Sequence, residues 1–293
     1  MEAIKTRGLT KSYGKNRGIT GLDLTIGEDE FYGFIGPNGA GKSTTIRTLL
    51  GLIRPDGGEA EVLGLDIVRD KNKILQSVGY LPSEINFYKG MKVIDTLKYS
   101  ASLRGIRDTS ESIKLADRLG LDLNKKVEQL SLGNRKKAGI ICAVQHHPKL
   151  LIMDEPTSGL DPLVQKEFFE ILQEENSNGT TVFLSSHILS EIQEYCGSAA
   201  FIKDGRIILK DKVSNLEQSG SKKVSVTGRI DDKEIMTLSG VAGLTKISET
   251  KMNFLYSGDI RKLLAFLSER ELKDISVTEP SLEEIFMNYY KEA

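Results

Sequence analysis

Apolar positions along roughly the first 215 residues fall into short continuous runs, separated by stretches with helical periodicity. Before residue 35, alternating apolar and polar residues broken by turn signals predict a small antiparallel sheet. Further apolar runs predict strands at 31–35, 61–64, 78–81, 150–153, 181–184 and 199–202, and periodic stretches predict helices at 44–50, 162–175 and 188–195. Strands that alternate with helices indicate a parallel α/β sheet.

From about residue 86 to 147 the pattern becomes helical, which predicts an inserted helical subdomain. The polar stretch 214–221 then marks a domain boundary. Beyond it the pattern predicts strands at 222–228, 243–248, 251–256 and 272–278 and helices at about 231–238, 259–269 and 281–291. The order βαββαβ suggests a ferredoxin-like plait plus a terminal helix. We therefore expect one domain over residues 1–215 and a small accessory α+β domain over 222–293, which we interpret as a regulatory or docking module.

A glycine-rich turn follows the first buried strand and leads directly into a helix. It has the spacing G-x-x-x-x-G-K-[ST] and consists of Gly36, Pro37, Asn38, Gly39, Ala40, Gly41, Lys42 and Ser43. Glycines let several backbone N–H groups face one point, so this run predicts a phosphate loop for a nucleoside triphosphate. Lys42 is expected to reach the β- and γ-phosphates, the Ser43 hydroxyl to bind Mg²⁺, and Thr44 to complete the nucleotide-binding set.

Two acidic residues end the apolar strand at 150–153. They lie at the carboxyl edge of the predicted sheet, where open α/β folds bind ligands. Asp154 is the candidate Mg²⁺ ligand, and Glu155 is the candidate general base that polarises an attacking water.

A single histidine, His187, follows the strand at 181–184, and its position favours a contact to the γ-phosphate. The pair His146 and His147 precedes Pro148 at the end of a predicted helix over 135–146, where helix capping accounts for both.

Composition and charge exclude several classes of protein. The 293 residues are 39% hydrophobic and 28% charged, as in an ordinary globular chain of roughly two domains. The net charge of -1 provides no overall field for nucleic acid, so no nucleic-acid partner is expected. No run approaches the roughly 18 apolar residues of a membrane span, and no signal peptide is recognised, which predicts a cytoplasmic protein.

The run Leu130-Ser131-Leu132-Gly133-Asn134 lies between the phosphate loop and the acidic strand end. Taken alone, it predicts only a helix capped by Ser131. Together with the phosphate loop, the acidic pair, the loop at 158–161 and His187, all in the same order, it resembles the LSGGQ signature of ABC-type ATPases. The resemblance covers roughly residues 1–215.

That resemblance implies the fold, the partners and further site residues. The fold would be the P-loop ABC cassette, with an antiparallel β subdomain, a parallel-sheet core and an inserted helical subdomain. Tyr13 matches the aromatic residue that stacks on adenine. Two such domains close head to tail in this family, so Ser131 and Gly133 would contact ATP held by a second subunit, either an identical chain or a close homologue.

The sequence departs from the family pattern in two places. Leu132 and Asn134 replace a glycine and a glutamine of the signature. Ser83 stands where the family usually has a glutamine that senses Mg²⁺, so Ser83 is the candidate there, through its hydroxyl and a water, with Glu84 as an alternative.

These departures and the C-terminal domain resemble the ATPase subunits of ABC-2-type exporters of drugs and antibiotics. The resemblance implies an ATPase held at the inner face of the membrane by a separate permease, whose coupling helix would dock on helices at about 86–105. One alternative is a soluble ABC ATPase that acts as an ATP-gated clamp on a macromolecular partner. A second is a module that binds ATP without hydrolysing it, which Glu155 and His187 disfavour.

Overall fold

The computed structural model describes residues 1–14, 18–217, 221–229, 231–281 and 284–285. It divides into two compact units, residues 1–210 and 211–293. The predicted terminal helix at 281–291 falls largely outside the described residues.

A six-stranded sheet forms the centre of unit 1, in the order β11-β10-β4-β9-β8-β7. Its strands are β4 (Phe31–Ile35), β7 (Val78–Leu81), β8 (Leu150–Asp154), β9 (Thr181–Ser186), β10 (Ser198–Lys203) and β11 (Arg206–Lys212). The five strands from β7 to β10 pair in parallel. Every residue of β4, β8 and β9 is buried, which explains why continuous apolar runs reveal them in the sequence.

A second, antiparallel sheet comes mainly from the first 66 residues, as the alternation near the N-terminus predicts. It contains β1 (Glu2–Ser12), β2 (Gly18–Leu22), β3 (Thr25–Gly27), β5 (Gly57–Val62) and β6 (Leu65–Asp66). Strand β5 begins at Gly57 rather than at 61, because Gly57 and Glu59 pair with β1 although neither is apolar. Pairing in the ladder, not burial, defines that end of the strand.

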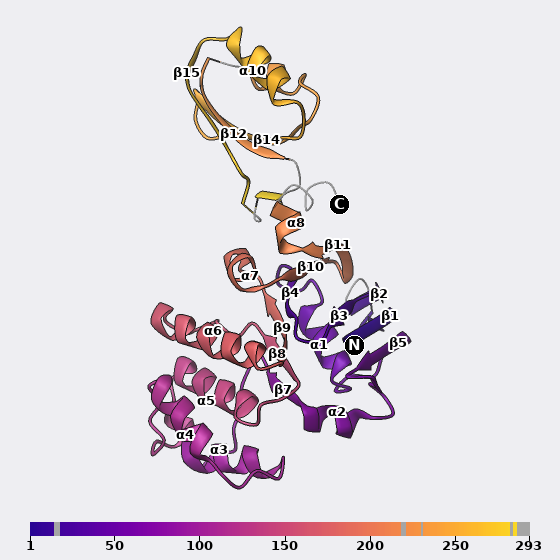
Figure 1. Cartoon of the computed structure of the whole chain (residues 1–293), viewed down its shortest axis with the longest axis vertical. Helices are drawn as coiled ribbons and strands as arrows, with labels where there is room; N and C mark the ends of the chain where they lie inside the picture. The colour runs from indigo at the N-terminus through magenta and orange to yellow at the C-terminus, as the bar shows by residue number, and fades with distance from the viewer. Residues whose placement is uncertain (15–17, 218–220, 230, 282–283, 286–293) are drawn as a thin grey trace. The chain divides into compact units, whose positions relative to one another are not determined.

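Helices cover both faces of the parallel sheet (Figure 1). Helices α1 (Lys42–Leu49) and α2 (Lys71–Ser77) lie on one face, and α5 (Leu132–Val144), α6 (Pro162–Ser177) and α7 (Leu189–Tyr195) lie on the other. Buried Ile46 and Leu49 of α1 join a single core that includes Phe34, Ile152 and Phe183. The helix that follows the phosphate loop is thereby fixed in the core.

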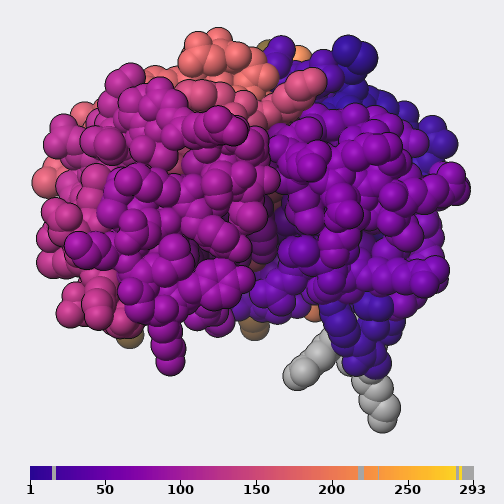
Figure 2. All heavy atoms as spheres, turned by 90° about the horizontal axis from the view of Figure 1, so that it is seen from below, coloured from indigo at the N-terminus to yellow at the C-terminus, as the bar shows by residue number. Residues whose placement is uncertain are grey.

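The inserted helices are α3 (Val93–Ser102), α4 (Ser110–Arg118), the 3-10 turn η1 (Val127–Gln129) and α5. Helix α5 begins three residues earlier than predicted, because the Ser131 hydroxyl caps it by accepting a hydrogen bond from the Asn134 N–H at 3.3 Å. In Figure 2 the insertion, in magenta, forms one lobe of this end of unit 1, and a furrow separates it from the purple lobe of residues near 50–80.

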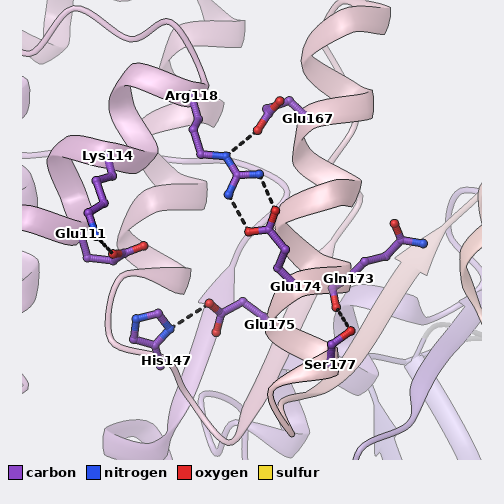
Figure 3. Close-up of polar contacts among 9 residues, drawn as sticks. All are labelled: Glu111, Lys114, Arg118, His147, Glu167, Gln173, Glu174, Glu175 and Ser177. Atoms are coloured by element: carbon purple, nitrogen blue, oxygen red, sulfur yellow. Dashed lines mark hydrogen bonds and ion pairs between the residues drawn. The ribbon is translucent and has the colours of Figure 1, made fainter.

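Ion pairs join helices α4 and α6 (Figure 3). The Arg118 guanidinium donates two hydrogen bonds to Glu174, at 2.6 and 2.8 Å, and one to Glu167 at 2.6 Å. Close by, His147 Nδ1 lies 2.8 Å from a carboxylate oxygen of buried Glu175. The His147 ring therefore contacts α6, while its backbone N–H donates to the Val144 carbonyl at 2.8 Å and so caps the end of α5.

Unit 2 has its own sheet and its own core. Strands β12 (Lys222–Gly228), β13 (Val241–Lys246), β14 (Lys251–Tyr256) and β15 (Leu272–Thr278) form a sheet in the order β13-β14-β12-β15, with antiparallel pairs throughout. Helices α9 (Asp232–Ile235) and α10 (Ile260–Ser268) complete a βαββαβ succession, and α8 (Val213–Glu217) precedes it. Val224, Phe254, Tyr256 and Leu263 are buried at the centre of this core.

Candidate functional site

The phosphate loop connects the carboxyl end of β4 to the N-terminus of α1. Gly41 has a φ of 111°, and a Cβ there would lie 2.9 Å from a methyl group of Ile19. Gly36 is closed in as well, because a Cβ would lie 2.4 Å from the Ile202 carbonyl. By contrast, a Cβ on Gly39, whose φ is 83°, would meet no atom within 4 Å. The loop is thus packed at both ends and open at its middle, where a phosphate needs room.

Lys42, the first residue of α1, is buried, and its side chain folds back across the loop. Its ammonium group donates to the carbonyls of Gly36 at 2.6 Å and Pro37 at 3.2 Å. The same group lies 3.1 Å from a carboxylate oxygen of Glu155. Lys42 therefore connects the phosphate loop to the acidic end of β8.

Asp154 and Glu155 lie in different environments, as the strand pattern predicts. The Asp154 carboxylate is fully buried and accepts a hydrogen bond from the Ser185 hydroxyl at 2.8 Å. Glu155 lies just beyond the strand with φ of 49°, and its carboxylate is partly exposed. This turn of the backbone separates a buried acid from one that faces the loop.

His187 approaches the other oxygen of the Glu155 carboxylate, with Nδ1 at 3.4 Å. Lys42, Glu155 and His187 come from three segments far apart in the sequence, and the structure brings them together at one edge of the sheet. About half of the His187 side chain is exposed, so the ring remains accessible to a ligand.

The residues at this edge suit a magnesium ion that is shared with phosphate. The second oxygen of the Asp154 carboxylate is buried without a hydrogen-bond partner in the described part of the chain, and a buried anionic oxygen favours a cation beside it. Among the described residues, no group of three or more His, Cys, Asp or Glu side chains could hold a metal by itself. One carboxylate, the Ser43 hydroxyl and ligand oxygens are the donor set that Mg²⁺ commonly takes in nucleotide sites.

Ser83, the other predicted magnesium residue, is held by its backbone. Its carbonyl accepts a hydrogen bond from Lys136 at 3.2 Å. Sequence reasoning does not identify Lys136, since a lysine one turn into a helix is ordinarily expected at the surface. Nor does it identify Ser185, whose hydroxyl contacts both Asp154 and the Glu155 N–H.

The residues of the LSGGQ-like run lie at the start of α5, against the loop that follows Glu155. A Cβ on Gly133 would lie 2.9 Å from the Gly159 carbonyl, and one on Gly159 would lie 3.0 Å from Leu132. The Leu132 side chain is 65% exposed. In the described part of the chain, no hydrogen bond joins Ser131 or Gly133 to the phosphate loop of the same molecule.

Tyr13 follows the end of β1 and is 51% exposed, with the Lys11 ammonium 5.7 Å from the ring centre. Neighbouring Ser12 pairs with Gly18. The Gly18 carbonyl lies close to the phosphate loop, because a Cβ added to Gly41 would be 3.0 Å from it. The aromatic ring therefore lies at the end of a hairpin that touches the phosphate loop.

Comparison with known proteins identifies the family. The family model for ABC transporters matches residues 19–158, which include the phosphate loop, the LSGGQ-like run and both acids. The bacitracin transport ATP-binding protein BcrA of Bacillus licheniformis is 36% identical over 222 residues, which cover 75% of this chain and 72% of BcrA. This chain belongs to the ABC transporter ATP-binding protein family.

Other comparisons extend beyond the cassette. The ABC transporter ATP-binding protein YhaQ of Bacillus subtilis, described as uncharacterized, is 34% identical and aligns with 95% of each chain. A solved ATP-binding subunit of an ABC transporter superposes with a TM-score of 0.69 at 27% identity, over 74% of this chain and 92% of that one. The fold is that of an ABC ATPase cassette, and the activity of this ABC ATPase is ATP hydrolysis. None of its described helices has the length and hydropathy needed to cross a membrane.

Proposed function

We propose that this ABC ATPase hydrolyses ATP at a site shared between two subunits and thereby drives a separate permease that exports a drug or antibiotic. The observation that supports this most directly is the meeting of Lys42, Glu155 and His187 beside the phosphate loop. The relative BcrA carries the name of a bacitracin transport protein, which supports the exporter assignment. A soluble clamp is not favoured by relatives of this kind.

In this proposal the loop holds the triphosphate through its backbone N–H groups and Lys42, while the Tyr13 ring stacks on adenine. Ser43 and Asp154 would hold Mg²⁺, which supplies charge neutralisation between the phosphates when bound. The buried, unpaired oxygen of Asp154 supports this role. The proposal adds the Ser83 hydroxyl to these Mg²⁺ ligands, through a water.

Glu155 acts as the general base and His187 donates a hydrogen bond to the γ-phosphate. A triphosphate carries more negative charge than the single carboxylate of Glu155, so ATP competes for Lys42 and draws its ammonium group away from Glu155. Glu155 then has a free carboxylate oxygen to orient water, with His187 still beside it.

The second half of each site comes from the partner subunit. Ser131 and Gly133 lie at the N-terminus of α5, where free N–H groups and the helix dipole favour a phosphate. A second copy of this chain, or a close homologue, would present them to the γ-phosphate held by the loop of the first.

A permease would dock on the insertion. Tyr88 is 69% exposed and packs edge-on against Tyr99, with ring centres 5.9 Å apart, and Leu103, directly after the helix that carries Tyr99, is also exposed. Exposed aromatic and aliphatic side chains that gather on one face mark protein contacts. The permease would hold the protein at the inner face of the membrane.

The Glu155→Gln variant tests the hydrolytic part of this proposal. It keeps the shape of the side chain and removes the base, so the ATPase rate is expected to fall at least about 100-fold while MgATP still binds. An ATP-bound dimer should then accumulate and can be measured by size-exclusion chromatography with light scattering. The matched control is Glu170→Gln, at an exposed position of α6, which should hydrolyse ATP at the wild-type rate. Wild-type turnover in Glu155→Gln would contradict the assignment.

A further inference from the structure

One buried lysine belongs to neither the phosphate loop nor the acidic edge. Lys136 lies on α5 one turn after the capped N-terminus and is only 2% exposed. Lysine is almost never buried to this degree without a partner, because its ammonium group loses hydration. Its hydrogen bond goes to the Ser83 carbonyl at 3.2 Å.

That hydrogen bond lies at the sequence edge of two segments that line a common groove. The groove has a volume of about 260 Å³, and it is lined by Ile85, Asn86, Phe87 and Lys89 from the residues after β7 and by Val127, Glu128 and Arg135 from η1 and α5. Ser83 lies two residues before Ile85, and Lys136 directly follows Arg135. A second bond, from the Gly90 N–H to the Glu128 carboxylate at 3.0 Å, joins the residues after β7 to η1.

The segment after β7 also packs tightly on α5. A Cβ on Gly139 would lie 2.4 Å from the end of the Ile85 side chain and 2.8 Å from that of Leu81. The side-chain ends of Ile85 and Leu81 thus fill the space beside Gly139, so the end of β7 and the residues that follow it pack closely on α5.

Lys136 also lies in the electrostatic field of the acidic edge. Burial lowers the pKa of Lys136, and the charges of Asp154 and Glu155 oppose that effect. One side chain thus links the helix that begins with the LSGGQ-like run, the segment after β7 and the acids at the end of β8.

We propose that Lys136 is a positioning residue for ATP hydrolysis. Its ammonium group fixes the Ser83 segment against α5, and it thereby sets the position of that segment relative to Asp154 and Glu155. The proposal rests on the ATPase activity of the isolated chain and does not depend on a permease or on the substrate transported.

Steady-state kinetics of Lys136→Met test the proposal. Methionine keeps an unbranched, buried side chain but has no donor, so kcat is expected to fall between about 10- and 100-fold through loss of alignment. The KM for ATP should stay within about twofold, because the phosphate loop is unchanged. Lys136→Arg, which keeps the charge and the donors, should recover most of kcat. Lys137→Met, at the neighbouring lysine, is the matched control and should behave as wild type.

Hydrogen–deuterium exchange provides a readout that does not depend on turnover. Without nucleotide, amides of residues 83–87 should exchange faster in Lys136→Met than in wild type or Lys137→Met, and Lys136→Arg should restore the protection. If the Met variant is unstable, Lys136→Leu replaces it, because leucine is also apolar and has no donor for the Ser83 carbonyl. The same loss of kcat and the same faster exchange are then expected.

Three results would overturn the proposal. The first is wild-type kcat in Lys136→Met, and the second is wild-type exchange over residues 83–87. The third is a rise in KM that accounts for the whole loss of kcat/KM, which would assign Lys136 to ATP binding. A wrong assignment of Glu155 as the base would give a different result. In that case Glu155→Gln would retain ATP turnover, whatever the Lys136 variants do.

Discussion

Glu155 adopts a backbone conformation that few residues other than glycine accept. Its φ of 49° costs about 1–2 kcal/mol. Its N–H is shared between the carbonyl and the hydroxyl of Ser185, at 3.1 and 3.2 Å, which stabilises the turn. The turn directs the carboxylate toward Lys42 and His187, so strain in one residue provides the geometry of the site.

His146 provides a test of stability against pH. Burial and the nearby Arg104 lower its pKa to about 4, and both ring nitrogens lack a hydrogen-bond partner in the described part of the chain. The unfolded chain takes up a proton near pH 6.5, but the folded protein does so only near pH 4, so stability should fall as pH decreases through this interval. In His146→Gln the fall should be smaller, as measured by the midpoint of thermal unfolding at a series of pH values across this interval. Parallel curves for the two proteins would contradict this expectation.

Sequence reasoning succeeds at single residues when the residue type constrains the backbone or the chemistry. Gly41 with its left-handed φ and Asp154 at the end of a buried strand belong to this class. It fails for Lys136 and for the His147–Glu175 pair, because their partners are far away in the sequence. Burial of a charged side chain is a tertiary property, and nothing in the local pattern indicates it.

At the scale of elements, the pattern predicts strands of the parallel sheet at nearly their observed positions, because both faces are buried and the apolar runs are continuous. It does not predict helix α2, since Ile74 is the only buried residue of that helix. It misplaces the start of β5 because polar residues pair there with β1. A helix with one buried residue, or a strand end held only by backbone pairing, leaves little hydrophobic periodicity in the sequence.

The joint between α4 and α6 should contribute to the stability of unit 1. Arg118 makes a two-point contact with Glu174 and a third bond to Glu167, which is stronger than a single exposed pair. Arg118→Met keeps the aliphatic stem and should lower the free energy of unfolding by about 1 kcal/mol, as measured by urea denaturation. The control is Lys114→Met on the same helix, whose exposed pair with Glu111 at 3.4 Å should contribute less than about 0.5 kcal/mol. If the two variants lost the same free energy of unfolding, the two-point geometry of the Arg118 contact would contribute nothing to stability.

At the scale of the whole molecule, two separate cores support two units. The core around Phe34 and Ile152 contains no described residue of unit 2, and the core around Phe254 contains none of unit 1. The polar stretch in the sequence predicts the change of unit at 214–221, and the structure divides the chain at 210. The division falls within β11, which belongs to a sheet of unit 1 and ends at Lys212, two residues before the predicted stretch.

The proposed permease contact is tested by a charge on the exposed aromatic face. In Tyr88→Asp, co-purification with membranes from cells that express the whole transporter should fall by at least about tenfold, since a carboxylate is costly to bury at an interface. ATP hydrolysis by the isolated variant should stay near wild type. Val68→Asp, at an exposed apolar residue before α2, is the control and should still co-purify. Full retention of Tyr88→Asp on membranes would rule out this face.

The contact between Lys42 and Glu155 has a thermodynamic consequence for ATP. The Glu155 carboxylate lies 3.1 Å from the ammonium group of Lys42, the cation that is proposed to hold the phosphates. Under the proposed function, Glu155 competes with ATP for Lys42, so the apparent affinity for ATP would be the intrinsic affinity reduced by the free energy of that ion pair. The group that weakens the capture of ATP would then be the same group that ATP frees to activate the attacking water.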